Sequence, residues 1–132
     1  MTATRKEEII TELRRYIAPD DIILAVFSLS GRELLPADEE KIHRAVCELK
    51  KKYPQLLEIF SFSRNDVYPF SKLLERVLLR LEIARLVTIE NPNLRIPPES
   101  KQYIHENVLP LFTEQQKEQL KQMGELFKQL VE

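Results

Sequence analysis

Residues 68–96 read YPFSKLLERVLLRLEIARLVTIENPNLRI. After the turn-like start at Tyr68-Pro69, apolar residues recur at helical spacing as far as Leu86, which predicts a long helix over Pro69–Leu86. Two short stretches rich in β-branched and apolar residues, Val87–Glu90 and Leu94–Ile96, follow on either side of Asn91-Pro92-Asn93. Such a pair predicts two short strands joined by a tight turn. This stretch therefore predicts a helix that runs directly into a small hairpin.

The rest of the chain is predicted to be mainly helical. Proline stops, acidic helix starts and the Thr113/Gln116 capping box mark most of the boundaries. Aromatic and β-branched content favours one further strand before Tyr68. The predicted elements are a helix over residues 5–17, an apolar helix over Ile22–Leu29 that ends near Gly31, a helix from Ala37 to Tyr53, a short strand over residues 56–63, a helix over Glu99–Leu109 and a last helix over residues 113–131.

Length and composition indicate one globular domain. The 132 residues suffice for one hydrophobic core, and no linker, repeat or low-complexity segment divides them. A single domain over 1–132 is expected, with its core at about 20–109 and flanking helices at both ends. The net charge of −1 gives no overall attraction to nucleic acid. With Cys47 as the only cysteine and no apolar run long enough for a membrane, we expect a cytoplasmic protein.

The helix followed by a hairpin is typical of a winged-helix module, and the wider order of motifs resembles one group of them. The chain resembles small prokaryotic winged-helix proteins, among them archaeal winged-helix regulators and Panacea-domain antitoxins. The resemblance covers about two-thirds of the chain and rests on the order of short motifs. The counterparts are Ile22–Gly31, Lys41–Tyr53, Ile59–Ser63, Tyr68-Pro69-Phe70-Ser71, Arg85-Leu86-Val87 and Pro97-Pro98-Glu99-Ser100.

This resemblance implies a mainly α fold with a small β-hairpin (α+β), a winged helix-turn-helix with extra terminal helices, acting as a DNA-binding transcriptional regulator. The chain departs from the family at three glycines. One is missing before Pro69, and Arg85 and Ser100 stand in place of the other two. Because the glycine at the helix end normally takes a positive φ, we predict a sharp helix end at Ala84-Arg85-Leu86.

Basic residues on the predicted helix 69–86 are candidates for DNA contact. Lys72, Arg76 and Arg80 follow each other at intervals of four residues, so they form a stripe along one side of a helix. Such a stripe can reach phosphates and guanine edges in a major groove, and Arg64 and Arg95 could extend it. The alternative is that these cations only keep a surface helix solvated.

Apolar and acidic residues on the same helix favour a different role. Leu79 and Ile83 fall on the side that should be exposed, beside Glu75 and Glu82. Neither residue type suits a groove lined with phosphates. They suit burial under the flanking helices of the same chain, or a protein partner. A protein-interaction module of the antitoxin or adaptor sort is therefore the second hypothesis.

The last helix carries a possible dimer seam. Leu120, Met123, Phe127 and Leu130 follow the spacing of positions a and d in a coiled coil. This predicts a homodimer that uses these residues, or else a helix packed back on Ile9, Leu13 and Ile17 of the same chain.

No catalytic constellation is found in the sequence. His43 and His105 have no neighbours at metal-ligand spacing, and the paired carboxylates Asp20-Asp21 and Glu39-Glu40 suit helix starts. We therefore expect no enzymatic activity, no cofactor and no metal.

Overall fold

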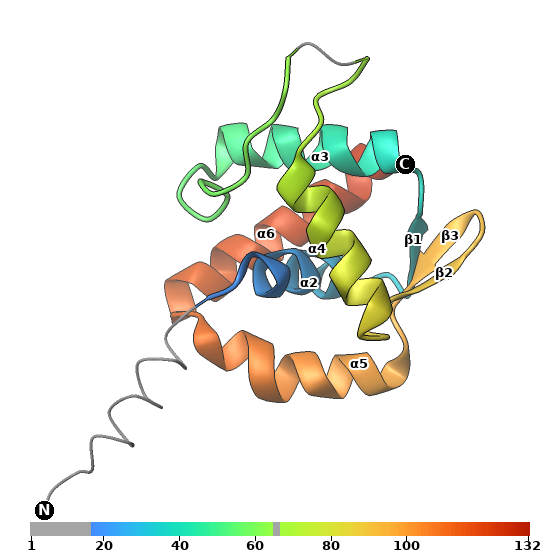
Figure 1. Ribbon diagram of the computed structural model, residues 1–132. Coiled ribbons are helices and arrows are strands. Elements are labelled where there is room, and N and C mark those ends of the chain that lie inside the picture. Colours follow the sequence, from blue (N-terminus) through green and yellow to red (C-terminus); the bar gives the residue numbers. More distant parts are fainter. Residues whose placement is uncertain (1–16, 65–66) are drawn as a thin grey trace, which may run out of the picture.

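The computed structural model describes residues 17–64 and 67–132, and most of its described residues are helical (Figure 1). The helix predicted for residues 5–17 lies outside the described residues, except for Ile17. The elements are α2 (Pro19–Leu29), β1 (Leu34–Pro36), α3 (Glu39–Lys52), α4 (Lys72–Ile83), β2 (Thr88–Glu90), β3 (Asn93–Arg95), α5 (Pro98–Tyr103) and α6 (Glu114–Val131). The prediction of a mainly α protein with a small β-hairpin (α+β) is thus confirmed, and the hairpin is part of a small three-stranded sheet.

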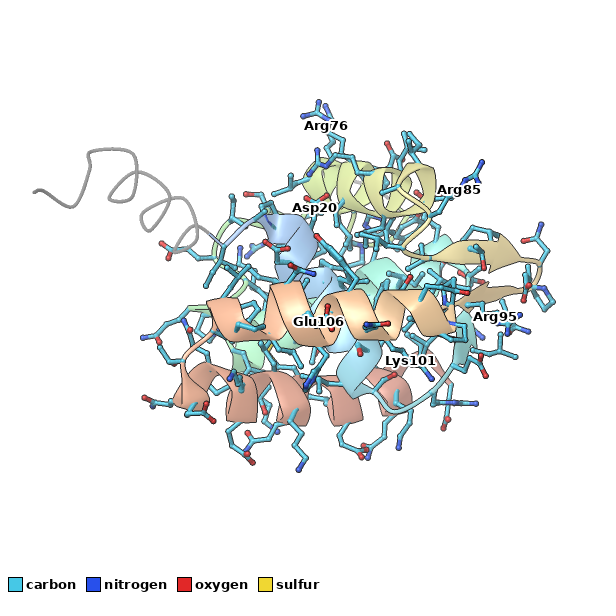
Figure 2. All side chains as sticks on the ribbon, turned by 90° about the horizontal axis from the view of Figure 1, so that it is seen from below. Asp20, Arg76, Arg85, Arg95, Lys101 and Glu106 are labelled. Atoms are coloured by element: carbon cyan, nitrogen blue, oxygen red, sulfur yellow. The ribbon has the colours of Figure 1, made fainter. Side chains whose placement is uncertain are left out.

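Helix α2 forms the centre of the molecule. Every side chain from Ile22 to Phe27 is buried, so this helix has no solvent face over its middle two turns. It packs against α6 on one side and α4 on the other. Figure 2 shows α4 and α6 at opposite sides of α2, with α5 running across the front. This layering decides which helix faces remain open to solvent.

Local capping explains where the helices begin. The Asp38 carboxylate accepts a hydrogen bond from the backbone N–H of Lys41 (3.1 Å), and the Ser71 hydroxyl accepts one from Leu74 (3.1 Å). At the start of α6, Thr113 accepts from the N–H of Gln116 (3.1 Å), and the Gln116 side chain accepts from the N–H of Thr113 (2.8 Å). The predicted capping box of α6 is therefore confirmed.

The three strands form one antiparallel sheet in the order β1-β3-β2. In its register, Leu94 of β3 pairs with Leu35 of β1 on one side and with Ile89 of β2 on the other. The hairpin was predicted, but β1 was not. Its three residues carry too little pattern, and β1 forms only because β3 lies beside it.

The strand predicted over residues 56–63 is wrong. Residues 54–59 form consecutive turns, and only Ser63 makes an isolated antiparallel bridge, to Phe70. The buried side chains here are Leu56, Leu57 and Phe60. Their spacing brings them to one side of a turn, whereas an alternating strand would point Leu56 and Leu57 in opposite directions.

The helix predicted over Glu99–Leu109 changes its winding along its length. Helix α5 continues as one wider turn over Ile104–Val108 and then tightens into a 3-10 turn over Leu109–Leu111. Ile104 and Val108 stay buried throughout, so the irregular turns keep the apolar side chains against the core.

Helix α4 ends abruptly at Arg85, as predicted. Arg85 has a φ of 60°, in the left-handed region that a side chain with a Cβ disfavours. After Arg85 the chain turns back, and the N–H of Leu86 donates a hydrogen bond to the carbonyl oxygen of Leu81 (2.9 Å). The reversal sends the chain directly into the hairpin.

The substitution Arg85→Gly is expected to stabilise the protein by up to about 1 kcal/mol, because glycine relieves the strain of the positive φ. Thermal and urea unfolding measure the change. The matched control is Ala84→Gly at the adjacent residue, whose φ is −75°, and here glycine should destabilise instead. A lower melting temperature for Arg85→Gly would contradict the strain at this position.

Candidate docking surface on helix α4

Helix α4 has one buried and one open side. Leu74, Val77 and Leu81 are buried and face the core that α2 forms. The opposite side lies at the front of the molecule in Figure 1, with no other labelled element in front of it. Helix α6 cannot cover this side because it packs on α2 and α3.

The predicted DNA-contact residues on α4 differ in whether a carboxylate of the same chain already binds them. Lys72 and Arg76 are exposed, and neither takes part in an ion pair within the described part of the chain. Arg76 points away from the body of the protein in Figure 2. Arg80 instead donates two hydrogen bonds to the Asp20 carboxylate, at 2.9 and 2.7 Å. That contact raises the pKa of Arg80 above its ordinary value.

The two other predicted cations lie apart from this stripe. Arg95 is at the end of β3, where its guanidinium pairs with Glu33 (3.2 Å) and Glu90 (3.6 Å). Arg64 is exposed in the loop that leads to α4. Arg80 and Arg95 are therefore partly neutralised by carboxylates, of which Asp20 and Glu33 come from distant parts of the chain. Sequence spacing gives no signal for such contacts.

Two large apolar side chains stand out on the open side of α4. Leu79 is 55% exposed and Ile83 is 72% exposed. Ile83 also borders a groove of about 400 Å³ whose lining includes Leu24, Leu86 and Tyr103. The apolar surface thus continues from α4 onto α5, and the sequence analysis had not identified Tyr103 as part of it. We call the surface formed by Leu79, Ile83, Leu86 and Tyr103 the α4 docking surface.

At the start of α4, a cluster around His43 joins this helix to α3. His43 is fully buried, and its ring stacks on Phe70 with 4.7 Å between the centroids. Its Nδ1 accepts a hydrogen bond from the N–H of Ser71 (3.1 Å), so the ring proton belongs on Nε2. That Nε2 has no hydrogen-bond partner among the described atoms, and the nearest carboxylate oxygen, on Glu39, is 3.9 Å away. Within the described residues, no group of side chains has the geometry to hold a metal ion.

Burial lowers the pKa of His43 below 6.5, although the charge of Glu75 opposes this shift. A charged ring would also need a proton on Nδ1 and would lose the bond from Ser71, which caps α4. We therefore expect full stability above about pH 6.5 and a decreasing free energy of unfolding below it. Between pH 6.5 and the lower pKa of folded His43, the imidazole binds a proton in the unfolded chain but not in the folded protein.

Urea unfolding at several pH values, with His43→Gln as the matched variant, measures this dependence. Glutamine does not titrate, and its amide oxygen can still accept from Ser71. Desolvation raises the pKa values of Glu39 and Asp21, so these carboxyls gain folded-state stability as the pH falls. The difference between wild type and variant isolates the histidine. Equal pH profiles for the two proteins would contradict the role of His43.

The apolar residues of α6 point inward. Leu120, Met123 and Phe127 are fully buried, and the Phe127 ring lies 5.2 Å from that of Phe27 in α2. They pack on α2 and α3 of the same chain, so they are not open to a second copy as a dimer seam would require. Of the predicted seam, only Leu130 remains partly open, at 38% exposure. This corrects the dimer interpretation for the buried residues.

Comparisons with protein-family models, with curated proteins and with solved structures found no match. Across residues 17–64 and 67–132, no helix has the length and apolar character needed to span a membrane.

Proposed function

We propose that this protein is a winged-helix module that docks another protein chain on the α4 docking surface. The order α2-β1-α3-α4-β2-β3, with β1 added to the hairpin sheet, supports the winged-helix assignment. In this assignment α4 is the helix that the module presents to its partner. The observation that carries the proposal is the exposure of Leu79 and Ile83 on the outward side of that helix.

Burial of these two side chains favours a protein partner energetically. Covering a leucine or isoleucine fully contributes about 1.5–3 kcal/mol, and both are already partly covered, so their joint contribution is smaller than twice that value. A protein interface gains this energy because apolar side chains at its centre exclude water. A phosphate backbone offers no comparable apolar surface.

The charges near the surface point to the same class of partner. Glu75 and Glu82 are exposed on α4, where they would meet phosphates with unfavourable electrostatics. The guanidinium of Arg80 already donates two hydrogen bonds to the Asp20 carboxylate. A protein partner can match such mixed charges with charges of its own.

Site-specific photo-cross-linking tests the proposal in the cells that make the protein. A photoreactive residue at Leu79 is expected to form a discrete protein adduct, and the adduct should disappear when Ile83→Lys is added. The control places the same residue at Glu118, which is exposed on α6 at the opposite side of the molecule. The docking proposal fails if position 79 gives no protein adduct, or if it gives the same adduct as position 118.

A second candidate function is DNA binding, which is favoured by Lys72 and Arg76, two exposed cations that form no ion pair with any described residue. With Arg64 as a third contact, log K against log salt concentration should have a slope of about −2 to −3. The triple variant with glutamate at these positions should lose binding and keep its fold, since all three are exposed. If wild-type protein shifts no long duplex at low salt, DNA binding is excluded.

A further inference from the structure

The open side of α4 has an apolar ridge with opposite charges on its two edges. At about 100° per residue, Lys72, Leu79 and Ile83 lie along the middle of this side, and Leu86 follows after the helix has ended. Glu75 and Glu82 fall on one edge, and Arg76 and Arg80 fall on the other. All the charged residues of both edges are exposed. The helix therefore presents an acidic edge and a basic edge, separated by the ridge.

Among the residues that the structure describes, no cation neutralises the acidic edge. Glu75 is close enough to Glu39 of α3 for the two side chains to share a hydrogen bond, and this contact contributes to the raised pKa of Glu39. Two carboxylates side by side repel each other unless a proton or a cation lies between them. Neither Glu75 nor Glu39 pairs with a lysine or arginine among the described residues. This edge is therefore complementary to an external cation.

The basic edge has a cation without a partner. Arg76 forms no ion pair in the described part of the chain, and Figure 2 shows it pointing outward. One turn further along, Arg80 is held in place by Asp20. The protein thus carries, on the same helix, an unmatched cation and the acidic pair that a cation would neutralise.

We propose that the chain docked on the α4 docking surface is a second copy of this protein, with the two α4 helices parallel about a two-fold axis. This inference rests on the docking function proposed above and names its partner. A two-fold axis parallel to the helices places the acidic edge of each α4 against the basic edge of the other. Arg76 of each copy then faces Glu75 and Glu39 of its mate. Leu79 and Ile83 lie between the charged contacts.

The charge arrangement selects the parallel orientation. If the helices were antiparallel about Leu79, Glu82 of one copy would face Glu75 of the other, and both basic edges would also meet. Like charges opposite each other disfavour that arrangement. The parallel pair has opposite charges along both edges, and each contact occurs twice because the interface is symmetric. The two Lys72 side chains, at the start of the ridge, are the like-charged pair that this arrangement brings near the axis.

Sedimentation equilibrium of the full chain, with charge reversals on α4, tests the inference. Wild type should be a concentration-dependent dimer. Glu75→Arg and Arg76→Glu should each raise the dimer Kd by at least about tenfold, since each makes two symmetric contacts repulsive. The double variant Glu75→Arg/Arg76→Glu restores opposite charges and should return the Kd to within about threefold of wild type.

Folding of the variants is checked by circular dichroism, and Glu75→Arg should fold well because it removes the carboxylate next to Glu39. Glu118→Arg on α6 is the control reversal and should leave the Kd unchanged. The inference is overturned if the wild-type protein stays monomeric up to about 1 mM, because a Kd above this concentration is too weak for a stable dimer. A double variant that remains as weak as the single variants overturns it as well. If position 79 still cross-links to a different protein, the docking function stands and only the identity of the partner is wrong.

Discussion

Phe127→Lys is expected to unfold the protein and not to yield a folded monomer. The Phe127 side chain is fully buried, and it packs on the ring of Phe27 at the centre of the α2–α6 contact. A lysine there would bury either a charge without a partner or, after losing its proton, an amine without a hydrogen-bond partner in place of the aromatic ring, and either state removes a large part of the stability of a typical domain. Circular dichroism and thermal unfolding should show the loss of a cooperative transition.

The milder substitution Phe127→Ala measures the same contact without a charge. Truncation of a buried phenylalanine leaves a cavity and costs about 3–5 kcal/mol. Leu130→Lys on the same helix is the matched control, because this side chain is 38% exposed and lysine can reach solvent from it. A stable, folded Phe127→Lys protein would show that α6 can leave the core, which would revive the dimer seam.

Gly124→Ala is expected to destabilise the protein strongly, although alanine favours a helix by about 1 kcal/mol over glycine. A Cβ at position 124 would lie 2.6 Å from the backbone carbon of Leu29, 2.7 Å from its oxygen and 2.7 Å from the nitrogen of Ser30. These backbone atoms cannot move aside as a flexible side chain can. Helices α2 and α6 must therefore move apart, and we expect the free energy of unfolding to decrease by about 1–3 kcal/mol.

Urea unfolding of Gly124→Ala against Glu125→Ala tests this close approach. Glu125 is the next residue on α6 and is exposed, so its replacement should change the free energy of unfolding by about 0.5 kcal/mol or less. If Gly124→Ala were as stable as wild type or more stable, the packing distance between α2 and α6 would have to be larger than the structure gives.

Features set by neighbouring residues were predictable from the sequence. The capping box at Thr113 and Gln116 and the sharp end at Arg85 each depend on contacts within a few positions along the chain. The hairpin belongs to the same class, although its turn is limited to Asn91 and Pro92 because Asn93 already pairs in β3. Helical and hairpin periodicities carry this information directly.

Part of the candidate surface was also predictable. The wheel of α4 placed Leu79 and Ile83 on the side away from the core, and both are exposed. Tyr103 was not predicted there because it belongs to α5, and only the packing of α5 beside α4 brings it to the groove. The sequence equally gave no reason to expect Asp20 to bind Arg80, since 60 positions separate them.

The elements that the sequence analysis missed or misassigned are those whose state depends on a distant partner. Strand β1 exists because β3 pairs with it, and the segment over residues 56–63 turns because the core accepts Leu57 and Phe60 together. The apolar stripe on α6 predicts that this face of the helix is buried. The stripe alone does not decide whether a second chain or the core of the same chain buries it. Gly124 lets α6 approach the backbone of α2, and that contact buries the stripe within one chain. By itself, the sequence determined where the helices begin, end and carry apolar faces, because those properties are local. Only the tertiary structure decided which faces meet, because burial depends on which surfaces fit at close range.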